Sequence, residues 1–136
     1  IDGLHQAAGS KKVYELHGSI HRNYCMKCGK FYGIEAVMTE EKVPHCTCGG
    51  IIKPDVVLYE EPLDSYTTDM ALAYVQAADV LIIGGTSLSV YPAASLVYNY
   101  MGNKLVLINK SPTSMDKDAD LLIDAPIGEV FEKIKI

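Results

Sequence analysis

The sequence has no apolar run that approaches the roughly 20 residues of a membrane-spanning helix. Its first residues show no basic segment followed by an apolar one, which is the pattern of a secretory signal. An excess of positive charge is also missing, because 12 Lys and Arg face 17 Asp and Glu, which gives 12 − 17 = −5. General nucleic-acid binding needs a basic surface, so direct nucleic-acid binding is not expected. With 49% hydrophobic and 21% charged residues, we expect a soluble globular protein of the cytoplasm without a membrane partner.

Three continuous apolar runs have the composition of buried parallel strands, and they span residues 79–84, 104–109 and 120–123. Segments with helical spacing alternate with these runs or follow them, at 65–78, 92–101 and 128–136. Alternation of strand and helix predicts βαβ units around a parallel sheet. The expected fold class is therefore α/β, with a Rossmann-like parallel sheet that is incomplete because it has only three or four clear strands.

The cysteines form two close pairs separated by 17 residues: Cys25 with Cys28, and Cys46 with Cys48. Each pair is followed by glycine, which lets the backbone turn so that its amides face the sulfurs. Four soft thiolates in this arrangement predict a tetrahedral structural zinc site with these four ligands. Two disulfides, or His45 in place of one cysteine, are the alternatives. The zinc module is expected at residues 22–53, inserted into a Rossmann-like part formed by 1–21 and 54–136.

The charge of this module bears on its role. Residues 22–53 hold five basic and three acidic side chains, so 5 − 3 = +2. Four thiolates and one Zn²⁺ add −4 + 2 = −2, which brings the module close to neutral. We therefore expect a structural module rather than a nucleic-acid reader, and a closed coordination shell excludes chemistry at the metal.

A glycine-rich loop, 84–90, follows the first of the predicted strands, and Asn109, Lys110 and Ser111 end the next one. In parallel sheets, ligands bind at the carboxyl ends of strands, where glycine allows close approach of the backbone. A plain strand-to-helix turn with a Ser cap is the alternative for the loop. A helix cap is the alternative for Asn109.

His17 lies in Glu15-Leu16-His17-Gly18-Ser19, where a short strand meets a glycine turn. A neutral imidazole in such a place can act as a general base near physiological pH. A hydrogen-bonded turn histidine without catalytic function is the plainer interpretation of the residue by itself.

Together these features resemble the sirtuin family of NAD-dependent protein-lysine deacylases, in its bacterial form. The resemblance rests on five stretches in the family's order: Ile1–His5 (the end of T-Q-N-I-D-x-L-H), Glu15–Ser19 (the catalytic-histidine motif), the four cysteines, Lys53–Glu61 (the strand that pairs with substrate) and Gly85–Ala93 (the NAD-ribose loop). It implies a zinc-bearing enzyme with NAD as cosubstrate and acylated-lysine proteins or peptides as partners.

The resemblance also implies roles for single residues. His17 would be the general base that activates a ribose hydroxyl of NAD, so that the acyl group ends on ADP-ribose and nicotinamide is released. Val57, Leu58 and Tyr59 would hold the substrate peptide through backbone hydrogen bonds. The NAD contacts implied are Ile1, Asp2, Gly85, Thr86, Ser87, Val90, Asn109, Lys110, Ser111 and Ile127.

Three departures from the family's pattern qualify this assignment. Tyr59-Glu60-Glu61 stands where the family usually has Phe-Gly-Glu, which predicts a preference for basic residues beside the target lysine. Cys46 and Cys48 have one intervening residue instead of two. The family's Gly-Ala-Gly half does not precede Ile1, so we expect a C-terminal portion that has little activity by itself. Protein ADP-ribosyltransfer and a non-catalytic zinc-bearing NAD-binding scaffold remain alternatives.

Overall fold

A computed structural model of the chain describes residues 1–39 and 43–135. Three of the charged residues counted for the expected zinc module lie outside the described residues: Glu40, Glu41 and Lys42. Ile136, at the end of the expected C-terminal helix, also lies outside them. The chain divides into two compact units, Ile1–Thr68 and Asp69–Ile136. Among the described helices, none is long and apolar enough to cross a membrane.

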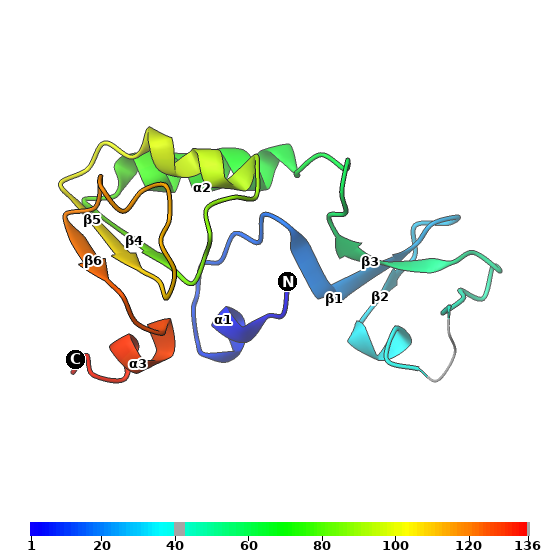
Figure 1. Cartoon of the computed structure of the whole chain (residues 1–136). Coiled ribbons are helices and arrows are strands. Elements are labelled where there is room, and N and C mark those ends of the chain that lie inside the picture. The colour runs from blue at the N-terminus through cyan, green and yellow to red at the C-terminus, as the bar shows by residue number, and fades with distance from the viewer. Residues whose placement is uncertain (40–42, 136) are drawn as a thin grey trace. The chain divides into compact units, whose positions relative to one another are not determined.

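The first unit is built on an antiparallel sheet that the sequence analysis did not anticipate. After the short helix α1 (Leu4–Ala7) come β1 (Gly18–Cys25), β2 (Phe31–Tyr32), the 3₁₀ helix η1 (Ile34–Ala36) and β3 (Ile52–Val56). The sheet order is β2-β1-β3, so β1 is central and pairs with a strand some 30 residues later in the chain (Figure 1). The pairing extends over most of β1, from Gly18 opposite Val56 to Cys25 opposite Ile52.

Asn23 sits at an irregularity in this sheet and is fully buried. Between Ser19 and Asn23 the register of β1 against β3 shifts. The Asn23 side-chain amide donates to the carbonyl oxygens of Ile20 at 3.0 Å and Gly33 at 3.1 Å. Buried carbonyl groups need such partners, because an unpaired one costs free energy. The bulge therefore depends on a specific polar side chain.

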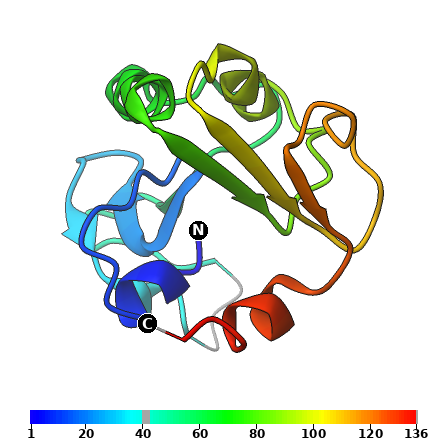
Figure 2. The same cartoon turned by 90° about the vertical axis from the view of Figure 1, so that its left-hand side faces the viewer.

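The second unit contains the predicted parallel sheet. The helix α2 (Ser65–Ala77) enters it and is followed by β4 (Val80–Gly84), the 3₁₀ helix η2 (Ala93–Asn99), β5 (Lys104–Ile108), β6 (Leu121–Ile123) and α3 (Ile127–Phe131). The three strands are parallel in the order β4-β5-β6, with Gly84 opposite Ile108 and Ile108 opposite Ile123. In Figure 2, α2 and η2 lie on one side of this sheet. The predicted α/β class, with a short parallel sheet, is confirmed.

Two of the predicted helices differ from expectation. The segment expected to be helical at 92–101 is a 3₁₀ helix, and it follows a cis peptide bond between Tyr91 and Pro92. The C-terminal helix begins at Ile127 and ends at Phe131, so it is shorter than the apolar spacing predicted. Its short length leaves Ile134 beyond the helix and 53% exposed.

Each unit has its own core. In the second unit the buried side chains Ile83, Leu88, Leu105, Leu107 and Met115 pack together, and Leu107, on the central strand β5, is fully buried. In the first unit the buried cluster consists of Cys25, Cys46 and Ile52, with Tyr32, Ala36 and Val37 against it. Two of the predicted metal ligands thus form part of the core of the first unit.

Candidate functional site

The four cysteines converge on one point of the first unit. Their sulfur atoms lie within 4.8 Å of one another, with 3.5 Å between the Sγ atoms of Cys25 and Cys48 and 3.7 Å between those of Cys28 and Cys46. A tetrahedral zinc with Zn–S bonds of about 2.3 Å requires sulfurs about 3.8 Å apart. The donor set and its spacing therefore fit a structural zinc ion.

Turns around the sulfurs explain why the cysteines can meet. Gly29 and Gly49 have φ angles of 71° and 77°, in the left-handed region that glycine tolerates best. The Gly29 amide donates to the Cys25 carbonyl at 2.9 Å, and the Gly49 amide to the Cys46 carbonyl at 2.8 Å. The single residue between Cys46 and Cys48 does not prevent the convergence.

Hydrogen-bond donors favour the thiolate form of Cys46. The Cys48 backbone amide and the Tyr32 hydroxyl both bond its sulfur, and they lower the pKa of the Cys46 thiol to about 5. The Tyr32 Oη donates to Cys46 Sγ at 3.0 Å. A thiolate is the form that binds metal. Tyr32 therefore supports a predicted metal ligand through a hydrogen bond, and its spacing from the cysteines in the sequence gives no signal of this role.

The alternatives for this site do not hold. All four cysteines are free, so the two-disulfide interpretation is wrong. Among the described residues that could hold a metal, the group consists of the four cysteines alone, without His45. His45 instead pairs with Ile51 in an isolated β-bridge, and it is exposed.

His17 lies in a turn directly before β1, and its side chain is half-buried. Its carbonyl oxygen accepts the Val57 amide at 3.1 Å, which joins the histidine turn to the segment expected to bind substrate. The N-terminal residues are attached to the same strand, because the Ile20 amide donates to the Ile1 carbonyl at 3.0 Å. The strand β1 thus brings together three predicted site segments, represented by Ile1, His17 and Val57.

Asp2 is held by a second set of contacts. The His21 Nε2–H donates to the Asp2 carbonyl oxygen at 3.0 Å, and the Asp2 carboxylate accepts the Leu4 amide at 3.0 Å. The Leu4 amide lowers the pKa of the Asp2 carboxyl below its ordinary value. At Gly3, which has φ = 71°, a Cβ atom would lie 2.8 Å from the His21 ring. Any other residue would therefore disturb this turn.

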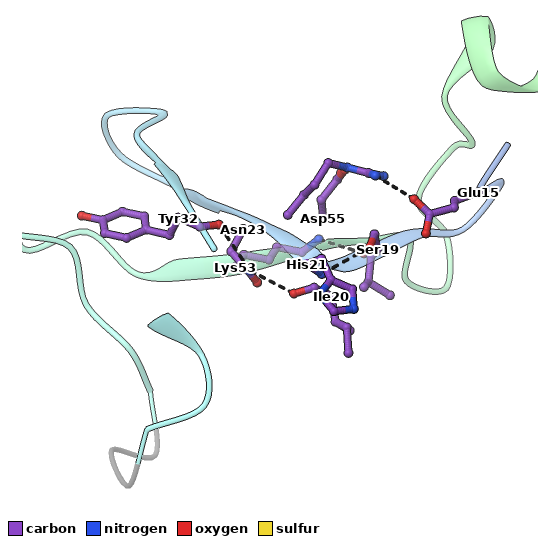
Figure 3. Close-up of polar contacts among 10 residues, drawn as sticks. Glu15, Ser19, Ile20, His21, Asn23, Tyr32, Lys53 and Asp55 are labelled. Carbon is purple, nitrogen blue, oxygen red and sulfur yellow. Dashed lines mark hydrogen bonds and ion pairs between the residues drawn. The ribbon is translucent and has the colours of Figure 1, made fainter. Parts of the chain in front are cut away.

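An ion-pair network lies beside the histidine turn. Arg22 NH1 contacts the Glu15 carboxylate at 2.7 Å, and Arg22 Nε contacts the Asp55 carboxylate at 2.8 Å. Partial burial raises the pKa of the Glu15 carboxyl, but hydrogen bonds from Arg22 and Gln6 outweigh this effect and keep it below its ordinary value. Figure 3 shows Glu15 before β1 and Asp55 on β3. No local pattern in the sequence marks Arg22, because its partners are 7 and 33 residues away along the chain.

The predicted substrate segment leaves β3 as an exposed turn. Leu58 is 57% and Tyr59 is 99% exposed, whereas Val57 is half-buried. The Glu61 carboxylate closes the turn by accepting the Leu58 amide at 2.9 Å and Lys53 Nζ at 3.4 Å. The residue before it, Glu60, is exposed and has φ = 69°.

In the second unit the glycine-rich loop follows β4. Gly85 has φ = 62°, and its amide donates to the Ile108 carbonyl at 3.0 Å. Leu88 is buried and anchors the loop, while the hydroxyls of Ser87 and Ser89 bond each other at 2.6 Å. The 3₁₀ helix that follows begins after Pro92 and has no side-chain cap, so the Ser cap of the alternative interpretation is wrong.

The carboxyl ends of the parallel strands bring several predicted NAD contacts to one edge. Gly84, Ile108 and Ile123 are opposite one another in the register, so Gly85 and Asn109 are neighbours at that edge. A Cβ atom on Gly84 would lie 2.2 Å from Ile127 Cδ1, so the glycine permits this close approach. The Asn109 side-chain amide donates to the Ser111 carbonyl at 2.8 Å and caps no helix.

The other predicted NAD contacts of the second unit differ in exposure. Thr86 is half-buried, and its hydroxyl accepts the Leu88 amide at 3.2 Å. The remaining ones are exposed: Ser87, Val90, Lys110 and Ser111.

Known proteins with similar sequences belong to one family. The model of the Sir2 family matches residues 1–92. An NAD-dependent protein deacetylase of Clostridium acetobutylicum is 60% identical over 136 residues, an alignment that covers 98% of this chain and 56% of that protein. Another, from Cutibacterium acnes, is 49% identical over 135 residues, with 99% of this chain and 55% of that protein covered. The chain thus spans about half the length of the curated relatives it matches.

Solved structures of Sir2 proteins are also similar to this chain. A structure described as Sir2 with p53 peptide and NAD⁺ has a TM-score of 0.90 at 37% identity, covering 98% of this chain and 58% of that one. A Sir2 complex with 2′-O-acetyl-ADP-ribose, a deacetylated p53 peptide and the inhibitor EX-527 has a TM-score of 0.90 at 39% identity, covering 98% and 59%.

Proposed function

The chain belongs to the Sir2 family, and we propose that it contributes the catalytic histidine, the zinc module and part of the NAD-binding residues of an NAD-dependent protein-lysine deacylase. In this reaction the acyl group passes to ADP-ribose and nicotinamide is released, so the enzyme is a transferase that also hydrolyses an amide. One observation carries the proposal: the hydrogen bond from the Val57 amide to the His17 carbonyl joins the backbone of the proposed base directly to the proposed substrate strand. The relatives' deacetylase names support the same reaction.

His17 is proposed to act as the general base, accepting the proton of a ribose hydroxyl of NAD. Its half-buried position before a strand gives the imidazole a fixed backbone while leaving part of it accessible. Asp2 is proposed to orient the nicotinamide carboxamide, with Ile1 beside it. This role is supported by the two hydrogen bonds that hold the Asp2 turn.

Contacts with NAD are proposed for residues at the strand ends of the second unit and, in the first unit, for Ile1 and Asp2. The glycine backbone at Gly85 and the neighbouring polar side chains suit a ribose or phosphate. The residues proposed for these contacts are Gly85, Thr86, Ser87, Val90, Asn109, Lys110, Ser111 and Ile127. Zinc has no part in the chemistry, because four thiolates close its coordination shell.

Acylated-lysine proteins or peptides are the proposed substrates, bound as an added strand along Val57, Leu58 and Tyr59. The exposure of Leu58 and Tyr59 supports this role, since it leaves the segment accessible to an incoming chain. We place the protein in the cytoplasm, because four reduced thiols at a metal site suit a reducing compartment. The domain division into a zinc module at 22–53 and a Rossmann-like part at 1–21 and 54–136 also remains a proposal.

Glu60 is the acidic residue proposed to select basic sequences beside the target lysine. Of the two consecutive glutamates, Glu61 is engaged by the Leu58 amide and by Lys53, whose charge balances it. Glu60 is exposed at the tip of the turn. Peptides with Arg or Lys next to the acetyl-lysine should therefore turn over faster at low salt than peptides with Asp or Glu, and Glu60→Gln should remove most of this difference.

The test is NAD-dependent turnover of an acetyl-lysine peptide, followed by mass spectrometry of both products. It is run on this chain and on a chimera in which these residues replace the matching part of the Clostridium acetobutylicum relative. The chimera should form acetyl-ADP-ribose, His17→Ala should abolish it, and His45→Ala, which alters an exposed histidine, should leave it unchanged.

Other products would point to the alternatives. ADP-ribose attached to protein, without acetyl-ADP-ribose in solution, would favour ADP-ribosyltransfer. A chimera that binds NAD and zinc but forms neither product would favour a non-catalytic scaffold. An active His17→Ala chimera would refute the assignment of the base.

A further inference from the structure

We propose that Arg22 is a positioning residue that fixes the His17 turn against β3. The inference rests on the proposed function, because it is that proposal which gives His17 and Val57 their roles. Arg22 is the single arginine of the chain, and it is placed on β1 between the two segments that it would connect.

The contacts of Arg22 reach both segments at once. Its NH1 group donates to Glu15, two residues before His17, at 2.7 Å. Its Nε group donates to Asp55, two residues before Val57, at 2.8 Å. The Glu15 side chain is 11% exposed and that of Arg22 is 41% exposed, so the carboxylate of this ion pair is shielded from solvent more than its partner.

Glu15 extends the network to the N-terminal residues. Its carboxylate also accepts a hydrogen bond from the Gln6 side chain, which lies in α1, shortly after Asp2. The network thus has an anchor close in sequence to each of the three site segments of the first unit. Between the segments themselves the structure has backbone hydrogen bonds, such as that from the Val57 amide to the His17 carbonyl.

Apolar packing does not replace this network at the histidine turn. A cavity of about 350 Å³ lies alongside, and its lining includes Glu15, Leu16, Gly18, Arg22, Asp55 and Val57. A segment that borders a cavity has fewer packed neighbours to define its position. The position of the turn therefore depends more strongly on its polar contacts.

The geometry requires arginine in particular. Two different nitrogen atoms of one planar guanidinium donate hydrogen bonds to two carboxylates from separate segments. Lysine has one ammonium group on a flexible stem and cannot reproduce this fork. We therefore expect Arg22→Lys to keep the positive charge but to hold the His17 turn against β3 only in part.

Amide hydrogen exchange of the zinc-loaded chain tests the proposal without requiring activity. The reporter is the Val57 amide, which donates to the His17 carbonyl, and the reference is the Met26 amide, which donates to Ile51 at 2.8 Å. Arg22→Met should speed Val57 exchange about tenfold, and Arg22→Lys about threefold, with Met26 unchanged. The control Lys104→Met, which removes the Lys104–Asp120 ion pair of the second unit, should leave Val57 unchanged.

Glu15→Gln provides a milder variant in case Arg22→Met does not fold. It should also speed Val57 exchange, and combining it with Arg22→Lys should add little, because both changes remove the same contact. Unchanged Val57 exchange in Arg22→Met or in Glu15→Gln would overturn the proposal. An equal rise at Val57 and Met26 would also overturn it, since it would mark Arg22 as a general stabiliser.

In the active chimera, Arg22→Lys should lower kcat about fivefold and leave the KM for NAD within twofold. A change in the KM for NAD with kcat intact would contradict a role at the His17 turn. If the parent chimera shows no turnover, the proposed function fails, whereas the exchange measurements still decide the role of Arg22.

Discussion

Substituting Tyr32 with phenylalanine should weaken zinc binding without altering the packing of the module. The substitution removes only the hydroxyl that donates to Cys46 Sγ at 3.0 Å. The aromatic ring stays, and so does its contact with the Lys30 ammonium, 5.2 Å from the ring centroid. Any loss of zinc affinity can therefore be assigned to the hydrogen bond.

The size of the effect follows from the charge on the sulfur. Hydrogen bonds to charged groups contribute about 1.5–3 kcal/mol, and losing a partner of a metal ligand lowers affinity about 10–100-fold. Zinc withdraws charge from the thiolate, and this weakens the sulfur as an acceptor. We therefore expect the lower end of the range, about a tenfold loss, which corresponds to about 1.4 kcal/mol.

Competition with a chromophoric zinc chelator measures this loss directly. The matched control is Tyr24→Phe, because Tyr24 is 40% exposed and its ring packs against Phe31 rather than against a sulfur. Tyr24→Phe should keep the parent's affinity. An affinity of Tyr32→Phe within twofold of the parent would refute the reasoning that this hydroxyl stabilises the bound thiolate.

Three further predictions concern stability. Asn23→Ala should lower the free energy of unfolding of the zinc-loaded chain by about 2 kcal/mol in urea, because it removes the side-chain amide that donates to the Ile20 and Gly33 carbonyls, of which Gly33 keeps only the Ala36 amide at 3.3 Å. Asn23→Asp should cost more, since a carboxylate would face those oxygens, and a smaller loss than for alanine would contradict this account. Glu60→Gly should raise the free energy of unfolding by about 0.5 kcal/mol and the melting temperature slightly, because Glu60 has φ = 69°, a left-handed conformation that glycine adopts with less strain. A lower melting temperature would show that the turn is not strained. The Leu105 amide and then Lys104 lower the pKa of Asp120 below its ordinary value of about 3.8, so its stabilising effect is complete above that pH and is lost as the pH falls through the lowered pKa. The difference in melting temperature between the parent and Asp120→Asn should therefore shrink below pH 4, and a difference that grows on acidification would reverse the assigned direction.

Several elements could be predicted from the sequence because their signals are local. Continuous apolar runs predicted β4, β5 and β6, and each predicted bound lies within one residue of the observed one. Such runs are informative because buried parallel strands need apolar side chains on both faces. The cysteine spacing and its glycines predicted the cluster of four cysteines that the structure contains, because two close pairs of thiols can supply a tetrahedral set of metal ligands. The Sir2-type motifs around His17 and Gly85 carried the family resemblance, and the matched family model agrees with it.

The tertiary structure alone decided the features that depend on contacts between distant segments. The antiparallel pairing of β1 with β3 joins residues 18 and 56, and no local pattern predicts such a partner. The same holds for Tyr32 at Cys46, for Arg22 between Glu15 and Asp55, and for the neutralisation of Glu61 by Lys53. A sequence shows which chemical groups are present and how they repeat along the chain. Which donor meets which acceptor depends on the long-range folding of the backbone, because hydrogen bonds and ion pairs form only over a few ångströms.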